Sequence, residues 1–101
     1  MTPFDSAQAR PGMILRGIDP ASLLAGRDEL ELTRLDIQRK LIVAGIKRYS
    51  LITVNLTGVI IDGNHGVFAA AEAGTEVEVL ITDFPFQPSF GPIVQLPVIK
   101  R

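Results

Sequence analysis

The residues whose types and spacing suit chemistry lie in one short turn, from Asp62 to Val67. The turn reads Asp-Gly-Asn-His-Gly-Val and contains His65, the single histidine of the chain. An apolar run precedes it and small residues follow it, which predicts a strand, a tight turn and the start of a helix. The first N–H groups of a helix have no acceptor within the helix, and its dipole favours an anion there. The sequence therefore predicts an anion site.

Three roles are open to the residues of this turn. The backbone N–H groups from Asn64 to Val67 can bind a phosphate or carboxylate, and Gly63 and Gly66 allow close approach. His65 can act as a general acid or base, or donate to phosphate oxygens. Asp62 can orient the imidazole, bind a metal ion or cap the helix. The alternative is an ordinary turn whose polar side chains bond to their own backbone.

The composition indicates one folded domain and excludes several chemistries. The chain has 101 residues, of which 47% are apolar, enough for a single modest core. The net charge of −1 gives no whole-chain electrostatic case for nucleic-acid binding. Cysteine is absent, so disulfides, thiolate catalysis and cysteine-based zinc sites are excluded. The sequence shows no metal-ligand cluster and no serine–histidine–acid motif.

The sequence also predicts a cytoplasmic protein without a membrane partner. No apolar stretch approaches the roughly 20 residues that span a bilayer. The N-terminus lacks the basic and apolar regions of a signal peptide. A toxin module exported by another route would share these features.

Hydrophobic periodicity and turn residues predict the elements around the turn. Residues 1–11 are expected to form a flexible or loosely docked lead-in. Expected strands cover residues 13–18, 51–55, 59–61 and 76–82, and expected helices cover 20–25, 28 or 33 to 44, and 64–73. In the long helix, the core-facing residues are expected to include Leu35, Ile37 and Leu41. The last segment, 84–101, contains four prolines and three phenylalanines. It is expected to be an extended arm that covers the domain's own surface or docks onto a second copy or a partner.

Basic residues gather along the long predicted helix and just after it, at Arg34, Arg39, Lys40, Lys47 and Arg48. Charged residues usually form the solvated face of a helix, which is one interpretation. The other interpretation is a cationic wall beside the predicted anion site.

Residues 12–83 resemble the ParB/sulfiredoxin superfamily. The resemblance rests on Val-Ile-Ile-Asp-Gly-Asn-His at 59–65, followed by an alanine-rich helix that ends at Gly74 and by a further apolar strand. It implies an α+β fold, a small mixed sheet of about four strands packed by two to three helices. It also implies a turn that holds nucleotide phosphates, as ParB proteins hold CTP and sulfiredoxins hold ATP, with Mg²⁺ as an accompanying ion.

The sequence departs from the family pattern at two positions. Asn64 stands where sulfiredoxins have their catalytic cysteine, so sulfiredoxin activity is excluded. Gly66 stands where the family has an arginine that grips phosphate, which removes the strongest phosphate contact a side chain can make.

Three functions remain open under this resemblance. The first is a module that binds a nucleotide or another phosphate-bearing ligand through residues 63–67. The second is a ParB-like nuclease or nucleotide hydrolase, including a bacterial toxin domain, with His65 as acid or base and Asp62 assisting. The third is a degenerate, non-catalytic module that makes only protein contacts, partly through the C-terminal arm. Across these functions the expected partners include DNA, a protein, or a second copy bound through the C-terminal arm.

Overall fold

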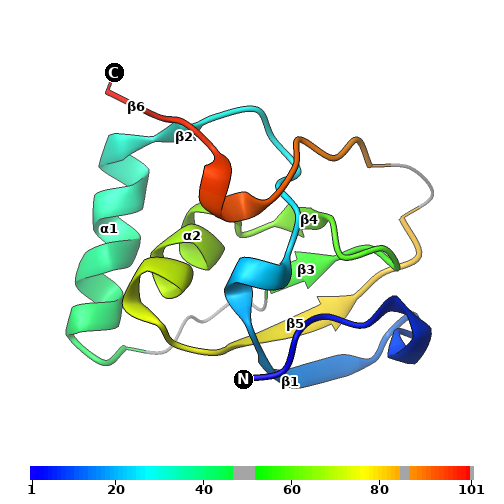
Figure 1. Cartoon of the computed structure of the whole chain (residues 1–101). Coiled ribbons are helices and arrows are strands. Elements are labelled where there is room, and N and C mark those ends of the chain that lie inside the picture. Colours follow the sequence, from blue (N-terminus) through cyan, green and yellow to red (C-terminus); the bar gives the residue numbers. More distant parts are fainter. Residues whose placement is uncertain (47–51, 85–86, 101) are drawn as a thin grey trace.

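The computed structural model describes residues 1–46, 52–84 and 87–100, and Figure 1 shows their arrangement. The order of the elements in the described residues is as follows: η1 (Ser6–Gln8), β1 (Ile14–Ile18), η2 (Pro20–Ser22), β2 (Leu30–Glu31), α1 (Leu32–Val43), β3 (Ile52–Val54), β4 (Ile60–Asp62), α2 (Asn64–Ala73), β5 (Val77–Ile81), η3 (Ile93–Gln95) and β6 (Val98–Ile99). The α segments are α-helices, and the η segments are short 3₁₀ helices.

A mixed sheet of four strands, in the order β1-β5-β3-β4, forms the base of the fold. Its central pair, β5 and β3, is parallel, with Thr53 opposite Leu80. The two outer pairs are antiparallel. A separate parallel pair joins β2 to β6. The chain is therefore an α+β protein with a mixed sheet, as the sequence predicts at this level.

Helix α2 lies between the sheet and α1 (Figure 1). Its Val67, Ala69 and Ala70 are buried, because small side chains allow a helix to approach a sheet closely. Val67 and Ala70 belong to one core cluster with strand residues such as Val54 and Val79. The predicted helix 64–73 is confirmed at both ends, and Gly74 ends it in the left-handed conformation with a φ of 67°.

Helix α1 begins at Leu32, one residue before the later of its two predicted starts, and it differs from its prediction in its buried face. Residues 30–31 form strand β2 instead of a helical turn, because they pair with β6. Leu35 is the buried residue of the helix, whereas Ile37 is 53% exposed. Only one narrow stripe of α1 therefore packs on the domain. The prediction that Ile37 belongs to the core-facing side was wrong.

The predicted helix over residues 20–25 is wrong beyond its first turn. Only Pro20–Ser22 is helical, because the chain then runs extended beside β4. The N–H of Leu24 donates to the Gly58 carbonyl at 3.0 Å, and the Leu24 carbonyl accepts from Ile60 N–H at 2.9 Å. Residues 23–25 thus cover the outer edge of β4.

The N-terminal segment, predicted as a flexible lead-in, is bonded to the domain at several points. Thr2 donates its N–H to Gly17 and accepts from Asp19 N–H, both at 2.8 Å. The N–H of Phe4 donates to Ser22 Oγ at 2.8 Å. Phe4 is also partly buried against the core cluster.

The described part of the C-terminal segment is bound to the chain's own residues 23–25 and to β2. Ala25 N–H donates to Gly91, and Ala25 accepts from Phe90 N–H, at 2.8 and 3.0 Å. Ile93 is fully buried and Leu96 nearly so.

No helix in the described part of the chain is long and apolar enough to cross a bilayer.

Candidate functional site

The turn between β4 and α2 has the geometry that an anion site requires. Gly63 adopts a φ of 108°, in the left-handed region, and α2 begins at the next residue. Gly63 has no side chain with which to cap the helix. The N–H groups of Asn64, His65 and Gly66 occupy the first turn, where a helix offers them no acceptor.

The prediction that Val67 contributes its N–H to this site is wrong. That N–H donates to the Gly63 carbonyl at 2.9 Å, as the first bond of the helix. The Val67 side chain is fully buried in the core. The backbone part of the site is therefore limited to residues 64–66.

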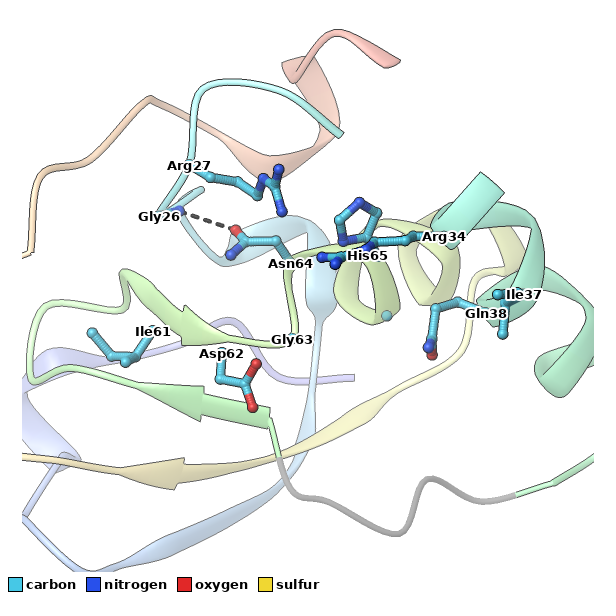
Figure 2. Close-up of a pocket in the computed structure, with 11 residues that line it drawn as sticks. Gly26, Arg27, Arg34, Ile37, Gln38, Ile61, Asp62, Gly63, Asn64 and His65 are labelled. Atoms are coloured by element: carbon cyan, nitrogen blue, oxygen red, sulfur yellow. Dashed lines mark hydrogen bonds between the residues drawn. The ribbon is translucent and has the colours of Figure 1, made fainter. Parts of the chain in front are cut away.

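A pocket of about 410 Å³ opens at this turn (Figure 2), within the size range of small-molecule sites. Three parts of the chain line it: the end of β4 with the turn into α2, the loop that follows residues 23–25, and residues 34–38 of α1. The lining residues are Gly26, Arg27, Arg34, Ile37, Gln38, Ile61, Asp62, Gly63, Asn64, His65 and Gly66.

Asn64 holds the Gly26 loop over the start of α2. Its Oδ1 accepts the Gly26 N–H at 3.0 Å, and the residue is 8% exposed. A side chain at Gly26 would not fit, since an added Cβ would lie 1.8 Å from the carbonyl oxygen of Ile60. This close approach places the next residue, Arg27, at the pocket.

His65 has a structural hydrogen bond. Its Nε2 accepts the backbone N–H of Glu31 at 3.0 Å, so Nε2 is unprotonated and the neutral ring carries its proton on Nδ1. Burial lowers the pKa of His65 below its usual range, and the positive charges of Arg27 and Arg34 lower it further, against the opposing effect of Glu31. Acid–base chemistry at Nε2 would require this bond to break.

Two arginines from different elements line the pocket. Arg34, from α1, belongs to the predicted cationic wall, whereas Arg27 was not predicted. The Nε of Arg27 is buried and has no hydrogen-bond partner in the described part of the chain. Glu31 lies 3.9 Å from the Arg27 guanidinium and 3.5 Å from that of Arg34. These separations lie beyond the usual hydrogen-bond length, so both cations retain donor capacity toward the pocket.

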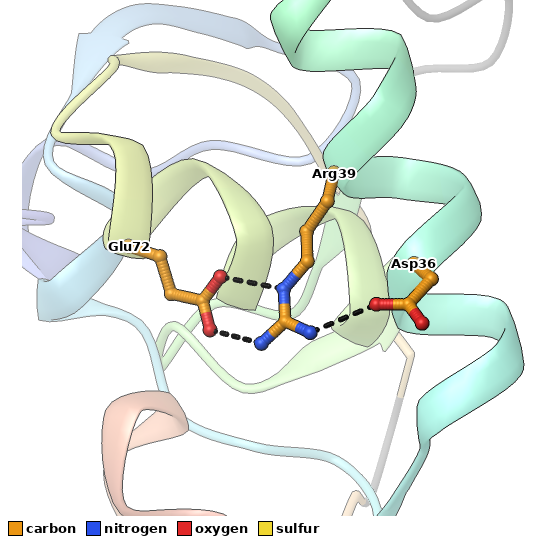
Figure 3. A network of polar contacts seen from close by, with 3 residues as sticks. All are labelled: Asp36, Arg39 and Glu72. Carbon is orange, nitrogen blue, oxygen red and sulfur yellow. Dashed lines mark hydrogen bonds and ion pairs between the residues drawn. The ribbon is translucent and has the colours of Figure 1, made fainter.

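The other members of the predicted cationic wall lie elsewhere. Arg39 binds Glu72 through two hydrogen bonds of 2.8 and 2.6 Å, and Asp36 through one of 2.9 Å (Figure 3). It thereby joins α1 to α2 instead of facing the pocket. Lys40 is exposed and does not line the pocket. Lys47 and Arg48 lie outside the described residues.

Asp62 lies at the pocket but not beside the imidazole. Figure 2 shows its carboxylate on the side of Gly63 that faces away from Arg27. No hydrogen bond joins Asp62 to His65 within residues 52–84, so the predicted orienting role has no contact to support it. Over the described residues, no three His, Cys, Asp or Glu side chains come together as metal ligands.

The structure therefore brings together most of the predicted turn with Arg34 and the unexpected Arg27. No family model, curated protein or solved structure matches this chain. Its function is consequently inferred from the geometry of this pocket.

Proposed function

We propose that this chain is a ParB/sulfiredoxin-like module that binds a nucleotide or another phosphate-bearing ligand in the pocket at the start of α2. One observation carries the proposal: Arg27 and Arg34 line the same pocket as residues 64–66, whose N–H groups have no acceptor within the helix. Guanidinium groups and helix N–H groups are the two donors that proteins use most effectively for phosphate.

Arg27 compensates for the arginine that the family pattern expects at position 66. A buried donor without a partner costs about 1–3 kcal/mol, and Arg27 Nε is such a donor among the described residues. A phosphate oxygen that accepts from this atom would remove the cost, which requires the Arg27 side chain to turn its enclosed Nε toward the pocket. Gly66, in turn, leaves room above the helix for a ligand to approach.

In this function His65 positions the site and transfers no proton. Its bond to the Glu31 N–H fixes the start of α1 relative to the start of α2, and these two elements carry Arg34 and the N–H donors. Nuclease or nucleotide hydrolase activity lacks such support, because no contact among the described residues prepares His65 or Asp62 for catalysis.

The proposed module covers residues 12–83, with 84–101 as an extended proline-rich arm. The hydrogen bonds of Phe90, Gly91 and Ile93 to residues 23–25 support an arm that covers its own domain. This arm also packs beside the Gly26 loop, because the Gln87 side chain donates to the Gly26 carbonyl at 2.9 Å.

Isothermal titration calorimetry with inorganic phosphate, CTP and ATP, each with and without Mg²⁺, tests the proposal. The Arg27→Gln and Arg34→Gln variants should each weaken phosphate binding about 10- to 100-fold, the equivalent of one charge-assisted hydrogen bond. Arg16→Gln is the matched control, because Arg16 is an exposed arginine on β1 and does not line the pocket. Absence of binding to all three ligands, or equal binding by the four proteins, would overturn the proposal.

A further inference from the structure

We infer that the ligand of this pocket is the phosphate monoester of a polyol, such as a sugar phosphate or a nucleoside monophosphate, whose hydroxyl groups donate to Asp62. This inference rests on the proposed function, and it names the chemistry of the part of the ligand that is not phosphate.

The pocket has opposite charges on its two sides. Arg27 and Arg34 lie with the N–H donors of α2, while the Asp62 carboxylate lies across Gly63 at the end of β4 (Figure 2). Asp62 is exposed, and its carboxylate forms no hydrogen bond or ion pair with the other described residues. Its oxygens are therefore available to a ligand in the pocket.

The charge of Asp62 limits what can lie beside it. An ionised carboxylate only accepts hydrogen bonds, and a second phosphate next to it would be repelled. A group that donates, such as a sugar hydroxyl, is attracted instead. A ligand with one phosphate at the arginines and hydroxyl groups that reach Asp62 satisfies both sides.

The remaining lining residues suit a sugar. The Gln38 amide can both donate and accept, which matches a hydroxyl group. Ile37 and Ile61 add apolar surface against which the C–H groups of a sugar ring or the face of a nucleobase can lie. A bare phosphate ion would leave this part of the pocket unused.

The test compares ribose 5-phosphate with inorganic phosphate by calorimetry, in the presence of EDTA, for the wild type, two Asp62 variants and one control variant. The wild type should bind ribose 5-phosphate at least tenfold more tightly than inorganic phosphate. Asp62→Asn and Asp62→Ala should reduce this ratio to below threefold, Asp62→Ala chiefly through the loss of sugar binding. Asp83→Asn is the control, because Asp83 is exposed and does not line the pocket.

A tenfold preference that persists in both Asp62 variants would overturn the inference while leaving phosphate binding intact. Failure of inorganic phosphate and ribose 5-phosphate alike to bind the wild type would instead overturn the proposed function itself.

Discussion

The Nε2 atom of His65 accepts a hydrogen bond from the backbone N–H of Glu31, at 3.0 Å and across 34 residues of sequence. Glu31 is the residue that precedes α1, and His65 lies in the first turn of α2. The bond therefore ties together the starts of the two helices that line the pocket. The histidine that the sequence offers as an acid or base thus has a defined structural partner.

Removal of this partner should destabilise the domain. His65→Ala leaves the partly buried Glu31 N–H without its acceptor and creates a cavity beside it. Together these effects should lower the free energy of unfolding by about 2–4 kcal/mol. Urea denaturation followed by circular dichroism measures the change, and a loss below about 0.5 kcal/mol, the usual range for a surface substitution, would show that the bond contributes little.

The lowered pKa of His65 predicts a specific pH dependence. The unfolded chain takes up the proton at the ordinary pKa of 6.5, whereas the folded protein takes it up only at lower pH. Between these two values the unfolded state binds more protons, so stability is complete above pH 6.5 and declines as the pH falls below it. Denaturation series between pH 8 and 5 should show this decline in the wild type and a flatter profile in His65→Ala. If the stability of the wild type and of His65→Ala falls in parallel with pH, other groups cause the decline.

The contact of Arg39 with Glu72, between α1 and α2, should contribute less to the stability of the domain than the His65 hydrogen bond. Both side chains are 38% exposed, so solvent screens them and the pair should contribute about 0.5–1 kcal/mol. A double-mutant cycle with Arg39→Gln and Glu72→Gln measures this coupling directly.

Salt and acid should both weaken the Arg39–Glu72 contact. The hydrogen bonds from Arg39 lower the pKa of Glu72 below its ordinary value of 4.5. The contribution of the Arg39–Glu72 pair to stability is therefore present above about pH 4.5 and is lost as the pH falls further. A coupling energy that stays the same in 1 M salt would contradict an electrostatic origin.

The sequence predicts local structure well where a short pattern decides it. The strand, turn and helix from 59 to 73 depend on adjacent residues: an apolar run, a glycine at a positive φ and a series of alanines that Gly74 ends. Strand β5 follows from the alternation of Val77 and Val79 with glutamates. In these segments the local preference and the tertiary packing agree.

The errors arise where distant segments decide the structure. Residues 23–25 are extended because they pair with β4 and with the C-terminal segment, and β2 exists because β6 lies beside it. The amphipathic pattern of α1 placed both Leu35 and Ile37 on the side expected to face the core. The narrow contact with α2 selects Leu35 and leaves Ile37 exposed.

For the candidate site, too, the features set by neighbouring residues could be predicted from the sequence, whereas those set by distant segments could not. The turn and its N–H donors are local features and could be predicted. The sequence could not show which arginines line the pocket and which bind elsewhere. Arg39 is engaged by Glu72, 33 residues further along the chain. Arg27 reaches the pocket only because Gly26 bonds to Asn64, 38 residues away. No local pattern distinguishes these two arginines.

The role of Gly26 leads to a further prediction about stability. Gly26→Ala would place a Cβ 1.8 Å from the Ile60 carbonyl oxygen, so the backbone must shift and the domain should lose about 3 kcal/mol or more. Gly45→Ala is the comparison. Its added Cβ meets no atom within 4 Å, but its φ of 70° should cost about 1–2 kcal/mol. A smaller loss for Gly26→Ala than for Gly45→Ala would contradict the close packing of this loop.

The most direct test of the central claim is an NMR titration of the ¹⁵N-labelled protein with inorganic phosphate. The backbone amides of Asn64, His65 and Gly66 and the side-chain Nε–H of Arg27 should shift together along one binding curve. The Val67 amide, which is bonded to Gly63, should shift less, and Arg27→Gln should weaken the binding about tenfold or more. Saturating phosphate that leaves the three amides unchanged, or that shifts residues elsewhere instead, would contradict a phosphate site at the start of α2.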